Sequence, residues 1–268
     1  MIIDFHTHIF PDIIAKRTVE ALKKQSTDNG YPIENHSPAT LSGILGSMQE
    51  KSIDISVVLP IATKPSHFES MNRFASEVNK QQNVISFGAI HPQDDDLKAR
   101  MKQIKDMGFK GIKLHPYFQN VKIDDIKFIK TVEEAVKNDL IVAIHSGLDS
   151  GFKTDMANPK DTLKLVKNID CSKVVLAHMG GCMQWDLVEE YLVGENVLFD
   201  TSYCLDIIKD QDQFFRIVKN HGADKILFGS DFPWTDGRQN AHKINQMPFS
   251  QEEKDAIFAG NAKRILGL

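Results

Sequence analysis

The chain has few cysteines and no long apolar run. Its three cysteines, Cys171, Cys182 and Cys204, are odd in number and form no Cys-x-x-Cys pair. This favours free thiols in a reducing compartment over a disulfide scaffold. No apolar stretch approaches the roughly 18 residues of a membrane span, and a strand expected to begin at Ile2 leaves no room for a signal peptide. We therefore expect a cytoplasmic protein that has no membrane partner.

Positive charge is not in excess either. The 32 lysines and arginines are outnumbered by 36 aspartates and glutamates, which gives a formal net charge of −4. This balance argues against a nucleic-acid partner and favours a small-molecule substrate. The sequence also lacks internal repeats, low-complexity tracts and linkers. Its length of 268 residues is typical of one α/β barrel, which takes about 250. We expect a single domain over residues 1–268.

What the sequence does contain is a regular alternation of short β-branched runs with longer amphipathic stretches. This alternation is typical of βα units around a parallel sheet. The candidate strands are Ile2–Phe5, Ile55–Leu59, Ile85–Ala89, Gly111–His115, Ile141–His145, Val174–His178, Val197–Asp200 and Ile226–Gly229. They predict a fold of the α/β class, a (β/α)8 or TIM barrel.

Three of the stretches between or after these strands carry helix signals. Residues 124–138 predict a helix whose apolar stripe comprises Ile126, Ile129, Val132 and Val136. Pro159 stands where a first helical turn would begin. Ser250 and Glu253 have the spacing of a capping box. They would open a closing segment, residues 250–268, that we expect to pack across the barrel base or outer ring.

Histidines recur where the apolar runs stop. His6 and His8 are two residues apart near the end of the first expected strand, so both side chains should face one side. His145, His178 and Asp231 end or directly follow the fifth, sixth and eighth expected strands. The carboxyl ends of parallel barrel strands meet at one mouth, and imidazole nitrogens with carboxylate oxygens are good ligands for a divalent ion. The pattern therefore predicts a metal site.

These motifs resemble the amidohydrolase superfamily of metal-dependent barrels, and within it the branch that contains aminocarboxymuconate-semialdehyde decarboxylase and its hydrolase relatives. The resemblance covers nearly the whole chain and rests on Asp4-Phe-His6-Thr-His8, Ile144-His145-Ser146, Ala177-His178-Met-Gly-Gly181, Gly229-Ser-Asp231-Phe-Pro233 and Gly260-Asn261-Ala262. It implies that His6, His8, His145 and Asp231 ligate one divalent ion and that His178 is a catalytic residue beside it. It also favours a homodimer. Such a ligand set suits Zn²⁺ first, and Mn²⁺, Fe²⁺ or Co²⁺ are compatible with it.

Two residues of the fourth expected strand leave alternatives open. Lys113 and His115 are two apart, so both can point inward. In binuclear members of the superfamily a carboxylated lysine on this strand bridges two ions. Lys113 is thus such a bridge to a second metal, a free cation for a substrate carboxylate, or a snorkelling structural lysine, with its stem buried and its ammonium in water. His115 is a candidate for substrate or second-metal binding. Asp4, expected on the face of His6 and His8, either orients a ligand or fills a polar barrel layer.

Residues beyond the strand ends would set the substrate. Arg238 either holds an anionic substrate group or is a solvated loop arginine, and Trp234 either walls the pocket or covers the rim. Tyr203 and Ser146 are expected near the site. The polar stretch from Ser26 to Thr40 is either a surface loop or a lid over the mouth.

The expected chemistry is hydrolysis at a carbonyl-type carbon of a small anionic molecule. A bound ion lowers the pKa of a water from 15.7 towards about 7, Asp231 accepts its proton, and His178 polarises the carbonyl or protonates the leaving group. The same groups permit non-oxidative decarboxylation of an unsaturated or aromatic carboxylate. A deoxyribonuclease-like barrel of the same superfamily is disfavoured, because such members normally carry a glutamate that bridges two metals where Lys113 stands, and because the chain is acidic. A closed structural metal site would not need both Asp231 and His178.

Overall fold

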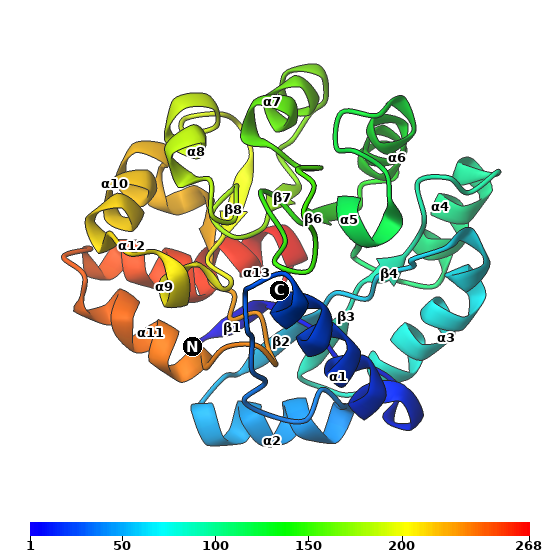
Figure 1. Ribbon diagram of the computed structural model, residues 1–268, viewed down its shortest axis with the longest axis horizontal. Helices are drawn as coiled ribbons and strands as arrows, with labels where there is room; N and C mark the ends of the chain where they lie inside the picture. Colours follow the sequence, from blue (N-terminus) through cyan, green and yellow to red (C-terminus); the bar gives the residue numbers. More distant parts are fainter.

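The computed structural model describes residues 1–268 and forms a ring of parallel strands surrounded by helices (Figure 1). Its strands are β1 (Ile3–Thr7), β2 (Ile55–Val58), β3 (Val84–Ser86), β4 (Gly88–Ala89), β5 (Gly111–Leu114), β6 (Ile141–Ile144), β7 (Val174–Leu176), β8 (Leu198–Asp200) and β9 (Ile226–Leu227). Every predicted strand is present, and the third is divided at Phe87 into β3 and β4. The predicted (β/α)8 barrel is confirmed.

Backbone hydrogen bonds order the strands around the ring. The strands form two parallel sheets, β1-β2-β3 and β4-β5-β6-β7-β8-β9, which the chain joins at Phe87. The segment that follows β9 returns to β1. There the N–H of Phe5 donates to the carbonyl of Phe228 (2.8 Å), and the N–H of Asp231 donates to the carbonyl of His6 (2.9 Å). These bonds bring Asp231 beside the His-x-His motif.

Helices form the outer layer of the molecule (Figure 1). They are α1 (Asp12–Asp28), α2 (Leu41–Lys51), α3 (Phe68–Val78), α4 (Leu97–Asp106), α5 (Pro116–Gln119), α6 (Ile126–Lys137), α7 (Pro159–Asn168), α8 (Trp185–Tyr191), α9 (Cys204–Ile207), α10 (Gln211–His221), α11 (Gly237–Gln246), α12 (Gln251–Asp255) and α13 (Asn261–Leu266). Short 3₁₀ turns occupy Pro65–His67 and Ala223–Lys225, and a π-helical turn, Ala256–Gly260, joins α12 to α13. None of the helices combines the length and apolar character needed to cross a membrane.

Helix α6 occupies the predicted helical stretch, but its buried face differs from the prediction. Phe128, Val132 and Ala135 are fully buried, whereas Ile126 is 60% exposed. These three buried residues share one helix face. The predicted stripe is wrong at Ile126 because this residue opens the helix and because the packed face is centred on Phe128. By contrast, α7 begins at the predicted Pro159.

The closing segment fills the amino-terminal end of the barrel. The predicted capping box of Ser250 and Glu253 is present, with both of its hydrogen bonds formed. Ile265 and Leu266 of α13 lie in one buried apolar cluster with inward-facing strand residues such as Phe5. The predicted packing of this segment across the barrel base is confirmed. Because apolar side chains fill this end, a polar site can form only at the carboxyl end of the strands.

A β-bulge in β1 changes which side chains enter the barrel. The pairing of β1 with β2 is regular at Asp4 and then shifts before Thr7, so Phe5 and His6 both point inward although they are adjacent. Asp4 points the other way. Its carboxylate accepts hydrogen bonds from the N–H (2.8 Å) and hydroxyl (2.5 Å) of Ser230. The prediction that Asp4 shares a face with His6 and His8 is wrong, because a strict two-residue alternation ends at the bulge.

Candidate metal centre

A cavity of about 230 Å³ lies at the carboxyl ends of the barrel strands. Its lining includes all five residues of the predicted site: His6, His8, His145, His178 and Asp231. These residues come from both ends of the sequence and from its middle, and only the closed ring of strands brings them to one mouth. The tertiary structure therefore assembles the predicted residues around one space.

Helix α1 covers the outer side of this cavity (Figure 1). Gln25 of α1 donates to the carbonyl of Gly151 (2.8 Å), and the hydroxyl of Ser26 bonds that of Ser150 (2.8 Å), so α1 is fastened to the loop after β6. Ser26 and Ile33 line the cavity. The predicted loop therefore begins only after α1 ends at Asp28, and its position favours the lid interpretation over that of a plain surface loop.

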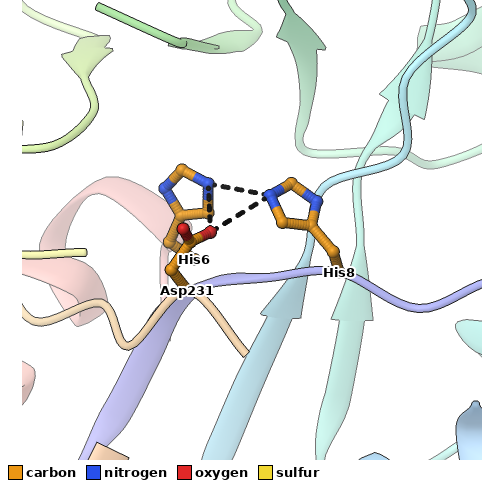
Figure 2. Close-up of side chains that lie close together, drawn as sticks. All are labelled: His6, His8 and Asp231. Atoms are coloured by element: carbon orange, nitrogen blue, oxygen red, sulfur yellow. Dashed lines mark hydrogen bonds and ion pairs between the residues drawn. The ribbon is translucent and has the colours of Figure 1, made fainter. Parts of the chain in front are cut away.

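His6, His8 and Asp231 form a compact group of potential ligand atoms (Figure 2). The Nε2 atoms of His6 and His8 are 3.0 Å apart, and Oδ1 of Asp231 lies 3.5 Å from the first and 3.4 Å from the second. Ligand atoms around a tetrahedral zinc ion, each 2.0–2.1 Å from the metal, are about 3.3 Å apart. The three observed separations fit this arrangement, so these residues fit a divalent ion.

The hydrogen bonds of the two imidazoles leave the nitrogens that face such an ion without a proton. Nδ1 of His8 lies 3.1 Å from the carbonyl of Leu59, and Nδ1 of His6 lies 2.8 Å from Oδ2 of Asp200. Both partners are acceptors, so Nδ1 carries the proton in each ring. The Nε2 lone pairs then face each other across 3.0 Å. A cation between them removes this repulsion.

Burial lowers the pKa of three imidazoles of the site, those of His6, His145 and His178. It lowers the pKa of His6 to about 4, with the nearby Lys113 ammonium as the next cause. For Asp231, burial alone would raise the pKa, but the hydrogen-bonded His8 and the neighbouring His6 lower it below its usual range. His6 and Asp231 are therefore held as a neutral imidazole and a carboxylate, which are the protonation states that metal binding requires.

His145 is the predicted ligand that the structure does not bring into the His6–His8–Asp231 group. Its Nδ1 lies 3.0 Å from Nε2 of His178. The other nitrogen of His145 faces the carbonyl of Leu148 (3.2 Å), and that of His178 faces the carbonyl of Ser202 (3.0 Å). By the same reasoning as above, two lone pairs meet between these rings. A shared proton or a second cation satisfies them.

Lys113 lies beside His6 and is fully buried. Its Nζ is 3.3 Å from Nε2 of His6, so the ammonium occupies the lone pair that an ion would take. Burial lowers the pKa of Lys113 to about 8, while Asp200 and Asp231 act in the opposite direction. Lys113 is thus not a snorkelling lysine. Its position suits both remaining predictions, a cation for the substrate and a carboxylated bridge.

His115 faces the cavity from the end of β5, where its ring stacks on that of His145 with centroids 4.2 Å apart. Its Nε2 lies 3.4 Å from Asp149, a residue that the sequence analysis did not single out. His115, His145 and Asp149 form a second group of potential ligand atoms. However, nearly parallel stacked rings, here 20° apart, do not aim their in-plane lone pairs at one point. This geometry favours a substrate-facing role for His115.

The remaining predicted residues divide between the cavity and the surface. Trp234 and Tyr203 line the cavity, so Trp234 forms part of the wall. Arg238 is exposed near the start of α11 and does not line the cavity, which agrees with the solvated alternative. Ser146 is buried and donates to the carbonyl of Ile144 (3.3 Å), outside the cavity lining.

Asp200 is the main residue of the site that sequence reasoning missed. It was recognised only as the end of an expected strand, although a carboxylate at a barrel strand end is the same signal that identified Asp231. Its Oδ2 holds His6, and its Oδ1 accepts from the backbone N–H of His178 (3.1 Å) and of Ser202 (3.0 Å). Burial alone would raise the pKa of Asp200, but His6 and His178 lower it below its usual range.

Comparisons with known proteins agree with the barrel fold and with the amidohydrolase resemblance. A family model described as Amidohydrolase matches residues 3–268, and a search of curated proteins finds no match. A solved TIM-barrel protein from Bordetella bronchiseptica is similar, with a TM-score of 0.76, 17% identity, and coverage of 99% of this chain and 98% of that one.

Two further solved structures have named activities. The 5-carboxyvanillate decarboxylase from Novosphingobium aromaticivorans, complexed with manganese and a nitrobenzoic acid derivative, gives a TM-score of 0.73 at 15% identity and covers 100% of this chain and 96% of that one. The probable 2-pyrone-4,6-dicarboxylic acid hydrolase from Acinetobacter baumannii gives 0.65 at 16% identity and covers 100% and 99%. At these identities the likeness shows the shared fold alone.

The metal content of the protein tests this centre directly. Protein purified without added metal or chelator is expected to contain about one divalent ion per chain by elemental analysis, because one group of ligand atoms has tetrahedral spacing. His8→Ala should lose it, whereas His242→Ala, a change at an exposed histidine, should not. About two ions would indicate that the His145–His178 pair binds a second one and that Lys113 is carboxylated. No ion after reconstitution would contradict the metal centre.

Proposed function

The chain belongs to the amidohydrolase family, and on that premise we propose that it is a metal-dependent hydrolase. Its substrate is a small, anionic molecule with a carbonyl-type bond, such as an amide or a lactone. The observation that carries the proposal is the convergence of two imidazole lone pairs and one carboxylate oxygen on one point of the cavity. A structural metal site is closed by four ligands, whereas this one faces a space large enough for a substrate.

His6, His8 and Asp231 would hold the ion, and His145 would join them by a change of rotamer or bind beside them. Zinc is the ion that this donor set suits first, and the manganese in a structurally similar decarboxylase makes Mn²⁺ the next choice. A divalent ion at this point supplies a Lewis acid that activates water and polarises a carbonyl oxygen. The acid–base and positioning steps belong to the side chains.

Asp231 acts as the general base in this proposal. Only its Oδ1 faces His6 and His8, which leaves Oδ2 to accept the proton of the attacking water. Its lowered pKa keeps Asp231 ionised at neutral pH, so Oδ2 carries no proton of its own. The proton then passes to the leaving group, which completes hydrolysis with no change in the enzyme.

Lys113 and His178 act on the substrate itself. Lys113 is the cation of the cavity, and a substrate carboxylate would replace His6 as its partner when an ion takes the lone pair of His6. His178 lies against the His6 ring, with centroids 5.2 Å apart, and also lines the cavity. It is therefore positioned to bind the carbonyl oxygen or the leaving group.

Decarboxylation is the second candidate, and the character of the cavity wall favours it. Phe10, Phe118 and Trp234 line the cavity and would bind a flat aromatic ring. A structurally similar protein is named as a decarboxylase of an aromatic carboxylate. In that reaction the carboxylate leaves as carbon dioxide, and an acid of the site protonates the ring carbon.

A substrate panel separates the two reactions. The metal-loaded protein would be incubated with lactones, cyclic amides, and aromatic or unsaturated carboxylates, and the products analysed by mass spectrometry in water enriched in the heavy oxygen isotope. We expect a product that gains one water and carries the heavy oxygen. A product that has lost carbon dioxide and gained no oxygen would replace hydrolysis with decarboxylation. No turnover of any compound by metal-loaded protein would count against both.

Asp231→Asn should impair the metal centre and the reaction together. The amide keeps the shape of the side chain but loses the negative charge and the basic oxygen. We expect kcat to fall by at least about 10²-fold and the metal content per chain to decrease. Asp236→Asn, at the N-cap of α11, is a matched control outside the cavity. Full activity of Asp231→Asn would exclude the proposed mechanism.

His178→Asn should separate catalysis from metal binding. If His178 acts on the substrate, kcat falls by at least about 10²-fold while metal content stays near that of the unmodified protein. Both quantities are measured on the same preparation, by turnover assay and by elemental analysis. Loss of the metal in this variant would mean that His178 is itself a ligand.

A further inference from the structure

We propose that Asp200 is the positioning residue that fixes which nitrogen of His6 faces the metal, and that Ser202 shares its hydrogen-bond network without this role. The inference rests on the proposed metal-dependent function and adds residues from the end of β8 to it. Asp200 and Ser202 are both fully buried. Neither lines the cavity, so neither touches a substrate.

The carboxylate of Asp200 accepts hydrogen bonds on both of its oxygens. Oδ1 takes the backbone N–H of His178 (3.1 Å), the backbone N–H of Ser202 (3.0 Å) and the hydroxyl of Ser202 (2.5 Å). Oδ2 faces Nδ1 of His6 at 2.8 Å. Since every partner of Oδ1 is a donor, the carboxylate cannot turn without breaking these bonds. Oδ2 is therefore held in place against His6.

The donors and acceptors around His6 then determine which of its ring nitrogens carries the proton. The single hydroxyl proton of Ser202 goes to Asp200, so the Ser202 oxygen can only accept at the imidazoles. It lies 3.0 Å from Nδ1 of His6 and 2.9 Å from Nδ1 of His178. On the other side of the ring, Nε2 of His6 faces Nζ of Lys113 at 3.3 Å, and an ammonium can only donate. Nδ1–H with a free Nε2 is the one arrangement that satisfies all of these contacts.

The same network also contacts His178, but there two groups of Ser202 face the same ring nitrogen. Nδ1 of His178 lies 3.0 Å from the backbone carbonyl of Ser202 as well as 2.9 Å from its hydroxyl. The carbonyl alone requires a proton on Nδ1. The backbone of His178 has a φ of 58°, a left-handed conformation that is uncommon for a residue with a side chain. Its N–H bond to Asp200 helps to hold it there.

Asp200→Asn should reverse the tautomer of His6. The amide oxygen would stay on the two backbone N–H groups, because an NH₂ group there would meet two donors. The NH₂ group would then face Nδ1 of His6 and require it to accept. The proton would move to Nε2 and point at the metal position, while the Ser202 hydroxyl turns to donate to Nδ1 and the Lys113 ammonium loses its acceptor at Nε2. Loss of such a supporting contact weakens metal binding by about 10- to 100-fold.

Ser202→Ala is the matched control. It removes hydroxyl contacts to the same two rings but leaves Oδ2 of Asp200 on His6 and the Ser202 carbonyl on His178. The required proton positions do not change. We therefore expect the zinc affinity of Ser202→Ala to stay within about threefold of the unmodified protein, well short of the loss expected when the tautomer-setting contact itself is removed. If Asp200 served only to fill and stabilise the buried network, both variants would weaken zinc binding alike.

Two measurements test the inference. Long-range ¹H–¹⁵N NMR spectra of the histidine rings, in the metal-free and zinc-loaded protein, report which nitrogen carries the proton. Competition with a chromophoric chelator gives the zinc affinity of each variant. We expect Nδ1–H at His6 in the unmodified protein, Nε2–H in metal-free Asp200→Asn, and weakened zinc binding in that variant alone.

Other outcomes overturn the inference. Nε2–H at His6 in the unmodified protein would do so even if Asp200→Asn failed to fold, because that measurement needs no variant. Equal loss of zinc affinity in Asp200→Asn and Ser202→Ala would reduce Asp200 to a structural role. If the unmodified protein bound no zinc or manganese but showed the expected tautomer, the proposed function would fail while the hydrogen-bond assignment stood.

Discussion

The β-bulge in β1 is the constraint on which the rest of the structure depends. Phe5 must face inward to fill the barrel base, where its ring meets that of Phe87 with centroids 5.7 Å apart. His6 must also face inward to reach Asp200 and Asp231. Adjacent residues of a regular strand face opposite sides, and the bulge removes that restriction. The apolar core and the polar site therefore meet at two adjacent residues, Phe5 and His6.

In this site the charged side chains and the neutral imidazoles that present lone pairs are different residues. Its formal charges belong to Lys113, Asp200 and Asp231, whereas burial keeps the imidazoles of His6 and His178 neutral. Neutral rings with a fixed proton on one nitrogen present a defined lone pair on the other, which is what a metal ligand or a catalytic base requires. The lone pairs meet in pairs, which is unfavourable until a cation or proton joins them. At His6 the Lys113 ammonium faces the Nε2 lone pair, and a divalent ion between His6 and His8 would take its place.

The two ends of the barrel have different roles. At the amino-terminal end, α13 seals the barrel with apolar side chains such as Ile265, which stabilises the fold. At the other end, the centre lies beneath α1 and beside Trp234. Hydrolysis and decarboxylation can share such a centre, because both need a divalent cation with proton-transferring groups beside it.

The sequence by itself determined the order of strands, the mouth at which they end and the residue types gathered there, because short-range periodicity and strand-end positions depend on local chemistry. It did not determine side-chain direction. Asp4 was misassigned because a bulge cannot be seen in a two-residue alternation, and Ile126 because a helix stripe does not reveal which face packs. Only the tertiary structure decided the tautomer of His6, since its partner Asp200 is 194 residues away, and such a contact exists only when the barrel closes.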